Sequence, residues 1–111
     1  MQNRILLEDM SYILNNLTSA EKEKFKGSTI IMTGCGGFLG YYFMHFFCHH
    51  AEELQIKKVI GLDNFLTGTR DWLDELDRKN DRLVLKDFNV ITDDIADVEG
   101  ASEANLIIHG A

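Results

Sequence analysis

The chain of 111 residues contains no proline, and it shows neither an internal repeat nor a low-complexity segment. Hydrophobic residues make up 45% of it and charged residues 26%, which is ordinary for a globular protein and argues against disorder. A chain of this length is large enough for a domain that hides roughly two-thirds of its unfolded surface. We therefore expect a folded unit with a core of its own.

Cysteine and long apolar runs are also scarce. Cys35 and Cys48 are the two cysteines, and their separation fits neither a zinc site nor a disulfide framework, so we interpret both as reduced thiols of a cytoplasmic protein. The first seven residues lack the apolar core of a signal peptide. No stretch has the length and apolar character of a membrane span, so no membrane partner is expected.

Basic residues are also few. The chain has 11 Lys and Arg against 18 Asp and Glu, for a net charge of −7, and no basic patch. An acidic surface does not attract a phosphate backbone, which argues against nucleic acid as a partner. Any bound phosphate must then be held locally by backbone N–H groups.

Short apolar segments alternate with helical patterns along the chain. Apolar spacings of three and four predict a helix over 4–17, and Thr18 with Glu21 forms a capping-box pattern for a short helix that Gly27 closes. The remaining pattern predicts strands over 28–33, 57–62, 82–88 and 105–109, with helices over 38–53, 69–79 and about 93–98.

This order predicts an α/β fold, a Rossmann-type doubly wound parallel sheet of which four strands are present, with right-handed crossovers. We expect residues 1–26 to form an N-terminal helical extension and residues 27–111 to form a Rossmann-type domain that stops after the fourth strand.

A glycine-rich loop joins the first predicted strand to the following helix. Gly34, Gly37 and Gly40 have the spacing G-x-x-G-x-x-G in T-G-C-G-G-F-L-G. Gly34 allows a tight turn, Gly37 allows a pyrophosphate to approach the backbone, and Gly40 allows close packing of the helix. The N–H groups of Gly37, Phe38 and Leu39 begin the helix, so we expect them to face the anion together with the helix dipole.

Asp63 ends the second predicted strand, 23 residues after Gly40. An acidic residue at that place accepts hydrogen bonds from the adenosine ribose hydroxyls in dinucleotide-binding folds. A 2′-phosphate would bring negative charge close to this carboxylate, so Asp63 predicts NAD rather than NADP as the ligand. Arg70 is the first cation after the loop D-N-F-L-T-G, and it would weaken this preference by folding back.

Together, T-G-C-G-G-F-L-G and G-L-D-N-F-L-T-G closely resemble the NAD-dependent epimerase/dehydratase family of extended short-chain dehydrogenases. The match looks closest to nucleotide-sugar enzymes such as UDP-glucuronate decarboxylases, dTDP-glucose 4,6-dehydratases and UDP-glucose 4-epimerases, and it covers about 29–111. The resemblance implies bound NAD, a nucleotide-sugar substrate, homodimers of the full-length enzyme, and transient hydride transfer through a keto-sugar intermediate. The reaction class would be that of a lyase or isomerase.

The resemblance also implies roles for matching positions. Gly37, Phe38 and Leu39 would line the pyrophosphate, and Asp63 with Asn64 would bind the adenosine ribose. Where the family usually has Asp and an aliphatic residue beside the adenine, this chain has Asn89 and Val90, which leaves open whether Asn89 or Asp87 faces the base. The predicted cofactor-binding residues are Gly34, Gly37, Phe38, Leu39, Gly40, Asp63, Asn64, Phe65, Thr67, Gly68, Asn89 and Val90.

The family's catalytic Tyr, with a Lys four residues later, has no counterpart here, because Asn16, His45 and Phe46 follow Tyr12, Tyr41 and Tyr42 at that spacing. No catalytic residue is therefore assigned, and the chain alone is expected to be inactive. The alternative is a non-enzymatic nucleotide-binding or interaction module with the same fold.

Two further patterns favour structure over chemistry. His45 and His49 have the spacing of a helical metal pair, but we interpret them as histidines at the edge of the core, and no metal site is predicted. Cys35 beside a helix N-terminus is interpreted as an unreactive loop residue.

Overall fold

Four parallel strands form one sheet at the centre of the chain in a computed structural model, which describes residues 4–65 and 70–110. The strands are β1 (Thr29–Thr33), β2 (Lys58–Asp63), β3 (Leu83–Asp87) and β4 (Leu106–His109), in the order β3-β2-β1-β4. All three pairings are parallel, with Ile30 opposite Val59 and Leu106. The α/β class and the Rossmann-type parallel sheet are confirmed.

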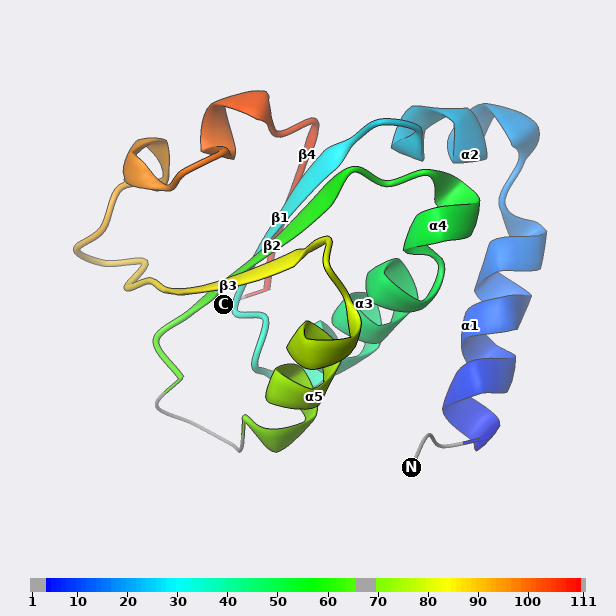
Figure 1. Cartoon of the computed structure of the whole chain (residues 1–111), viewed down its shortest axis with the longest axis horizontal. Helices are drawn as coiled ribbons and strands as arrows, with labels where there is room; N and C mark the ends of the chain where they lie inside the picture. Colours follow the sequence, from blue (N-terminus) through cyan, green and yellow to red (C-terminus); the bar gives the residue numbers. More distant parts are fainter. Residues whose placement is uncertain (1–3, 66–69, 111) are drawn as a thin grey trace.

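The helices follow the predicted order (Figure 1). They are α1 (Arg4–Asn16), α2 (Ser19–Phe25), α3 (Phe38–His49), α4 (Ala51–Leu54) and α5 (Asp71–Lys79). The capping box at Thr18 is present, because its hydroxyl accepts from the N–H of Glu21, and the Glu21 carboxylate accepts from the N–H of Thr18. Gly27 follows α2 with φ of +70°, as its capping role requires.

Two helix predictions need correction. The segment 38–53 is not one helix, because His50 leaves the helical conformation with φ −108° and ψ 14°, and the bend turns Ala51 and Leu54 into the core. Residues 93–98 hold only the 3-10 turn η1 (Ile95–Asp97), and a second turn, η2 (Ala101–Glu103), was not predicted. The segments that contain η1 and η2 are too short and too polar to show a helical pattern of apolar positions.

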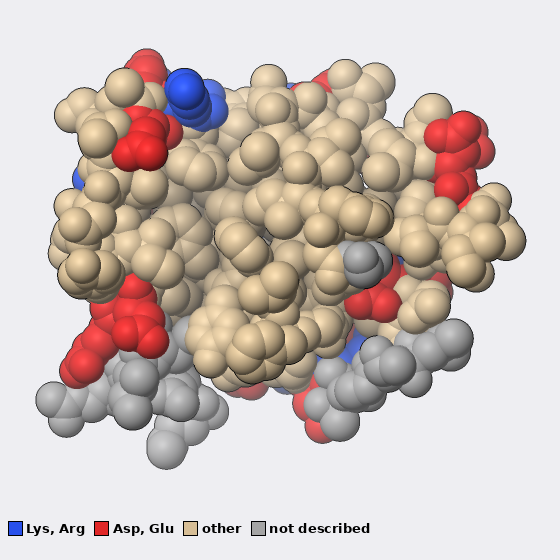
Figure 2. All heavy atoms as spheres, turned by 180° about the vertical axis from the view of Figure 1, so that it is seen from behind, with Lys and Arg blue, Asp and Glu red and all other residues tan. Residues whose placement is uncertain are grey.

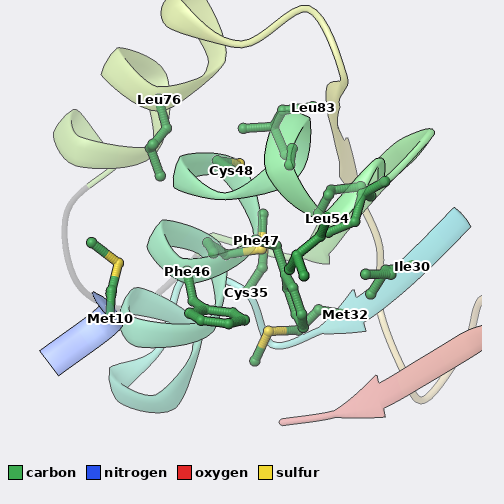
Figure 3. Close-up of a cluster of buried hydrophobic side chains, with 14 of the residues drawn as sticks. Met10, Ile30, Met32, Cys35, Phe46, Phe47, Cys48, Leu54, Leu76 and Leu83 are labelled. Carbon is green, nitrogen blue, oxygen red and sulfur yellow. The ribbon is translucent and has the colours of Figure 1, made fainter. Parts of the chain in front are cut away.

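The main core lies between the sheet and the helices (Figure 3). Alternate residues of the strands, such as Ile30 and Met32 of β1, point into it and meet Phe46 and Phe47 of α3. Met10 and Leu14 of α1 are buried in the same cluster, so the N-terminal extension packs against the sheet domain. Within the described ranges, no helix is long and apolar enough to cross a bilayer.

The opposite face of the sheet has a thinner cover. Ile31, Ile60, Leu62 and Phe88 form a small cluster there, packed against side chains of η1 and η2. Figure 1 shows these turns on the other side of the sheet from α3, α4 and α5. The chain thus runs outward from β1 to β3 on one side and returns to β4 on the other, so the sheet order reverses at β1.

Candidate functional site

The strand order reverses at β1, and open parallel sheets bind ligands at the carboxyl ends of the strands that flank such a reversal, here β1 and β4. The glycine loop 34–37 leaves β1 at this point. Gly34 has φ of +69°, and its N–H donates to the carbonyl of Leu62 at 2.8 Å. A residue with a side chain would be strained in this left-handed conformation, so the predicted turn role of Gly34 has a physical basis.

Gly40 brings the start of α3 against the loop. A Cβ placed on Gly40 would lie 2.5 Å from the carbonyl carbon of Cys35 and 2.8 Å from its Cα. The close approach is therefore between helix and loop backbone, directly after the strand. No side chain beyond hydrogen fits at this position without moving the helix.

The N-terminus of α3 differs in one detail from expectation. The N–H of Gly37 donates to the carbonyl of Gly34 at 3.1 Å, so it is engaged within the loop. The N–H groups of Phe38 and Leu39 have no hydrogen-bond partner in the part of the chain that the structure describes. Their side chains are exposed. These two donors remain suited to an anion.

Asp63 joins the glycine loop to the loop after β2. Its Oδ2 accepts from the N–H of Gly36 at 2.8 Å, and its Oδ1 accepts from the N–H of Phe65 at 3.0 Å. A Cβ on Gly36 would lie 3.0 Å from Oδ2, so Gly36 also needs to be glycine for this contact. Sequence reasoning missed Gly36, although the doublet Gly36-Gly37 was the available signal.

Phe65 and Arg70 cover the outer side of this junction. Phe65 has φ of +57°, an uncommon conformation for a residue with a side chain. The guanidinium carbon of Arg70 lies 4.0 Å from the centroid of the Phe65 ring, and its Nε lies 3.5 Å from Oδ1 of Asp74. Arg70 therefore folds back toward the loop, while Asn64 is exposed beside it. Thr67 and Gly68 lie outside the described residues.

The segment after β3 carries the two candidates for the adenine side. The Oδ1 of Asn89 accepts from the N–H of Ile91 at 2.9 Å, and the N–H of Asn89 donates to Asp93 at 2.8 Å. The Asn89 oxygen is thus engaged in a local turn, whereas Asp87 ends β3 with an exposed side chain, in register with Asp63. Val90 is 49% exposed and presents an apolar surface at the same end of the sheet.

Hydrogen bonds join the carboxyl ends of β1 and β4. Thr33 Oγ1 lies 2.7 Å from Nδ1 of His109, and the N–H of Gly110 donates to the carbonyl of Thr33 at 2.9 Å. A Cβ on Gly110 would lie 3.0 Å from that carbonyl oxygen, so a side chain at this position would require the neighbouring atoms to shift. His109 was not singled out from the sequence, because a lone histidine at a strand end carries no pattern.

The titratable groups near the loop are set by burial. Burial, helped by the negative charge of Asp63, raises the pKa of the Cys35 thiol to about 12, so it stays protonated and unreactive at neutral pH. His45 is buried and packs against both Tyr41 and Trp72, with ring centroids at 4.4 and 5.3 Å. Its Nδ1 lies 2.7 Å from the Tyr41 carbonyl oxygen. No group of three metal-ligating side chains occurs among the described residues.

No family model, curated protein sequence or solved structure matches this chain. The candidate site is therefore described from the geometry of this structure alone. Strand ends, a glycine loop and a carboxylate meet at the reversal of the sheet.

Proposed function

We propose that this chain binds NAD at the carboxyl end of the sheet, as the cofactor-binding part of a nucleotide-sugar epimerase, dehydratase or decarboxylase of the cytoplasm. The observation that carries the proposal is the contact between Asp63 and Gly36 at 2.8 Å, which sets the acidic end of β2 against the glycine loop. Phosphate-facing donors and a ribose-facing acceptor then lie on one short stretch of surface.

The residues present fit such a dinucleotide. Each carboxylate oxygen of Asp63 holds one backbone hydrogen bond and has a second lone pair for a ribose hydroxyl. The N–H groups of Phe38 and Leu39 would hold the pyrophosphate, next to a Gly37 whose missing side chain leaves the backbone open. Bound NAD would supply a hydride acceptor, and the protein residues named here would bind and orient it.

NAD should bind more tightly than NADP. A 2′-phosphate removes a hydroxyl donor from the Asp63 carboxylate and adds like charge beside it. Arg70 is the first cation after Asp63 in the sequence, and its charge is shared with Asp74 at 3.5 Å, so we expect it to offset only part of this penalty. We expect a preference of about ten- to a hundredfold, which corresponds to about 1.4–2.8 kcal/mol.

Calorimetric titration of NAD and NADP tests the proposal. Asp63→Ser should reduce the NAD/NADP affinity ratio, whereas the control Asp87→Ser, at the end of the neighbouring strand, should leave the ratio unchanged. The ratio is the decisive quantity, because Asp63→Ser also loosens the loop and lowers both affinities. Absence of NAD binding by the wild type, or a ratio unaffected by Asp63→Ser, would contradict the assignment.

A non-enzymatic nucleotide-binding module is the second candidate. Residues 1–111 contain no tyrosine followed four residues later by lysine. The purified 111-residue chain should therefore bind NAD without converting any nucleotide sugar. Steady sugar conversion or NADH formation by this chain would show that other residues perform the chemistry.

A further inference from the structure

Three aromatic rings join α3 to α5, which lie side by side on one face of the sheet (Figure 1). The rings of Tyr41 and Trp72 have centroids 4.9 Å apart and planes inclined by 17°, and His45 packs against both rings. Tyr41 and Trp72 are partly buried and pack against the main core. Stacked rings bury a large apolar area and favour one relative placement of the elements that carry them. Trp72 therefore holds the start of α5 on the start of α3.

Tyr41 closes the first turn of α3, where the proposed pyrophosphate donors lie. Its N–H donates to the carbonyl of Gly37 at 3.0 Å, and the N–H of Gly37 donates to the carbonyl of Gly34 at 3.1 Å. Phe38 and Leu39 lie within this turn, and the N–H groups of a first turn have no acceptor inside the helix. A contact that fixes Tyr41 therefore also fixes the direction of these donors.

Trp72 lies in the first turn of α5, two residues after Arg70, the N-cap residue of this helix. The guanidinium carbon of Arg70 lies 4.0 Å from the centroid of the Phe65 ring, and the N–H of Phe65 donates to the Asp63 carboxylate at 3.0 Å. The Phe65 ring in turn lies against the glycine loop, since a Cβ on Gly36 would be 3.7 Å from its Cδ1. A continuous series of contacts thus leads from the start of α5 to the proposed ribose acceptor.

The charge of the chain does not by itself attract a pyrophosphate. Basic residues number 11 against 18 acidic residues. Figure 2 shows uncharged residues across the middle of one face, with Lys and Arg only in small groups at its rim. Without a positive field, affinity depends on donors and acceptors that are in place before the ligand arrives. The relative placement of the two halves of the site therefore matters for binding.

We propose that Trp72 is a positioning residue for the cofactor, an inference that rests on the proposed NAD site. Its stack on Tyr41 fixes the pyrophosphate donors of α3 relative to the Asp63 carboxylate. The hydrogen bond from the glycine loop to Asp63 is one connection between these two halves, and the aromatic stack is a second. Without the stack, NAD must itself bring the halves together, and this ordering reduces its affinity.

Titrations of NAD and adenosine into matched variants test this role. Trp72→Leu removes the ring and should weaken NAD binding about tenfold, or about 1.4 kcal/mol, whereas Trp72→Tyr keeps a ring and should stay within about threefold of the wild type. Adenosine reaches only the Asp63 half of the site, so its affinity should be the same in all three proteins. A purely structural role would instead lower both affinities together. Tyr41→Leu removes the other ring of the stack and should reproduce the loss of NAD affinity.

Hydrogen exchange of the protein without ligand tests the same linkage. The N–H groups of Gly36 and Phe65 both donate to the carboxylate that ends β2, so they report whether the two loops stay together. Both should exchange about tenfold faster in Trp72→Leu than in Trp72→Tyr. The N–H of Val59, which donates at 2.9 Å to the carbonyl that precedes β3, should exchange at the same rate in both variants.

Four results would overturn the role of Trp72 and leave the NAD assignment intact. They are equal NAD affinities of the wild type and Trp72→Leu, equal losses for NAD and adenosine, no recovery in Trp72→Tyr, and unchanged exchange at Gly36 and Phe65. A wild type that binds no NAD would overturn the NAD assignment and this role together, so the two failures are distinguishable.

Discussion

The two faces of the sheet are covered by different kinds of structure, helices on one face and a polar segment with two 3-10 turns on the other. On one face, α1, α3, α4 and α5 contribute to a continuous core that includes Met10, Met44 and Leu73. On the other, the polar segment with η1 and η2 covers a cluster of four buried residues. Both faces exclude water from β1, yet only the first is held by helices. Residues on the two faces are buried to the same extent but pack against different cover, so we expect the two faces to respond differently to a cavity.

The helix-covered face should be most sensitive at Gly40. Gly40→Ala places a Cβ against backbone atoms of Cys35, and backbone atoms cannot move aside as the end of a flexible side chain can. We therefore expect the free energy of unfolding to fall by about 4 kcal/mol, or the protein not to fold. Gly37→Ala is the matched control, because its Cβ would meet only the Gly34 oxygen at 3.4 Å. Urea unfolding measures both, and equal losses would show that α3 shifts to accommodate the methyl group.

A pair of neighbouring isoleucines compares the faces directly. Ile30 and Ile31 are both fully buried in β1, but Ile30 points to the helices and Ile31 to the 3-10 turns. Ile30→Ala should cost about 4 kcal/mol and Ile31→Ala about 2–3 kcal/mol, because the thinner cover can collapse into the cavity. Chemical denaturation gives the difference, and a larger loss at Ile31 would reverse the comparison.

The thiols report how often the helix-covered face opens. Burial raises the pKa of Cys35 and of Cys48 to about 12, so roughly one thiol in 10⁴ is ionised at pH 8. Both should resist a disulfide reagent until the protein unfolds, whereas Val98→Cys, on the thinner face, should react rapidly. Fast reaction of the native wild type would mean that the helices detach readily.

A smaller effect is expected on the stability of the fold at acidic pH. Burial lowers the pKa of His45 below its ordinary value, so the unfolded chain takes up a proton more readily than the folded one. The His45 contribution to stability is complete above the ordinary histidine pKa of about 6.5 and is lost as the pH falls through that region. His50 shifts the same way for the same main cause.

His45→Phe keeps a flat ring against Tyr41 and Trp72 and removes the proton site. Unfolding free energies measured from about pH 7.5 to about pH 5.5 should fall less steeply in this variant than in the wild type. An identical slope would place the pH dependence in His50 and the other titrating groups.

Much of this architecture was predictable from local patterns. The capping box at Thr18, the strand that precedes Gly34 and the acid that ends β2 are short-range signals, since each depends on residues within a few positions. The break at His50 was not predictable, because no glycine or proline marks it and only the burial of Ala51 and Leu54 explains it. The turn η2 was not predicted, because its three residues are too few to show a helical pattern of apolar positions.

The site shows the same division. Gly34 and Asp63 were recognisable from the sequence, because each directly follows or ends a short apolar strand pattern. Gly36 and His109 were not, because their partners, Asp63 and Thr33, lie 27 and 76 residues away. The position of Arg70 over Phe65 also depends on how the loop folds, and no local pattern in the sequence predicts it.

The sequence by itself determined the alternation of strands and helices, the glycine loop and the acidic strand end, because periodicity and turn chemistry act locally. Only the tertiary structure decided that the Asp63 carboxylate is shared between two loops and that Thr33 meets His109 at the carboxyl ends of β1 and β4. Those features arise from contacts between residues far apart in the chain. No local preference encodes such contacts, and they form only when the whole sheet assembles.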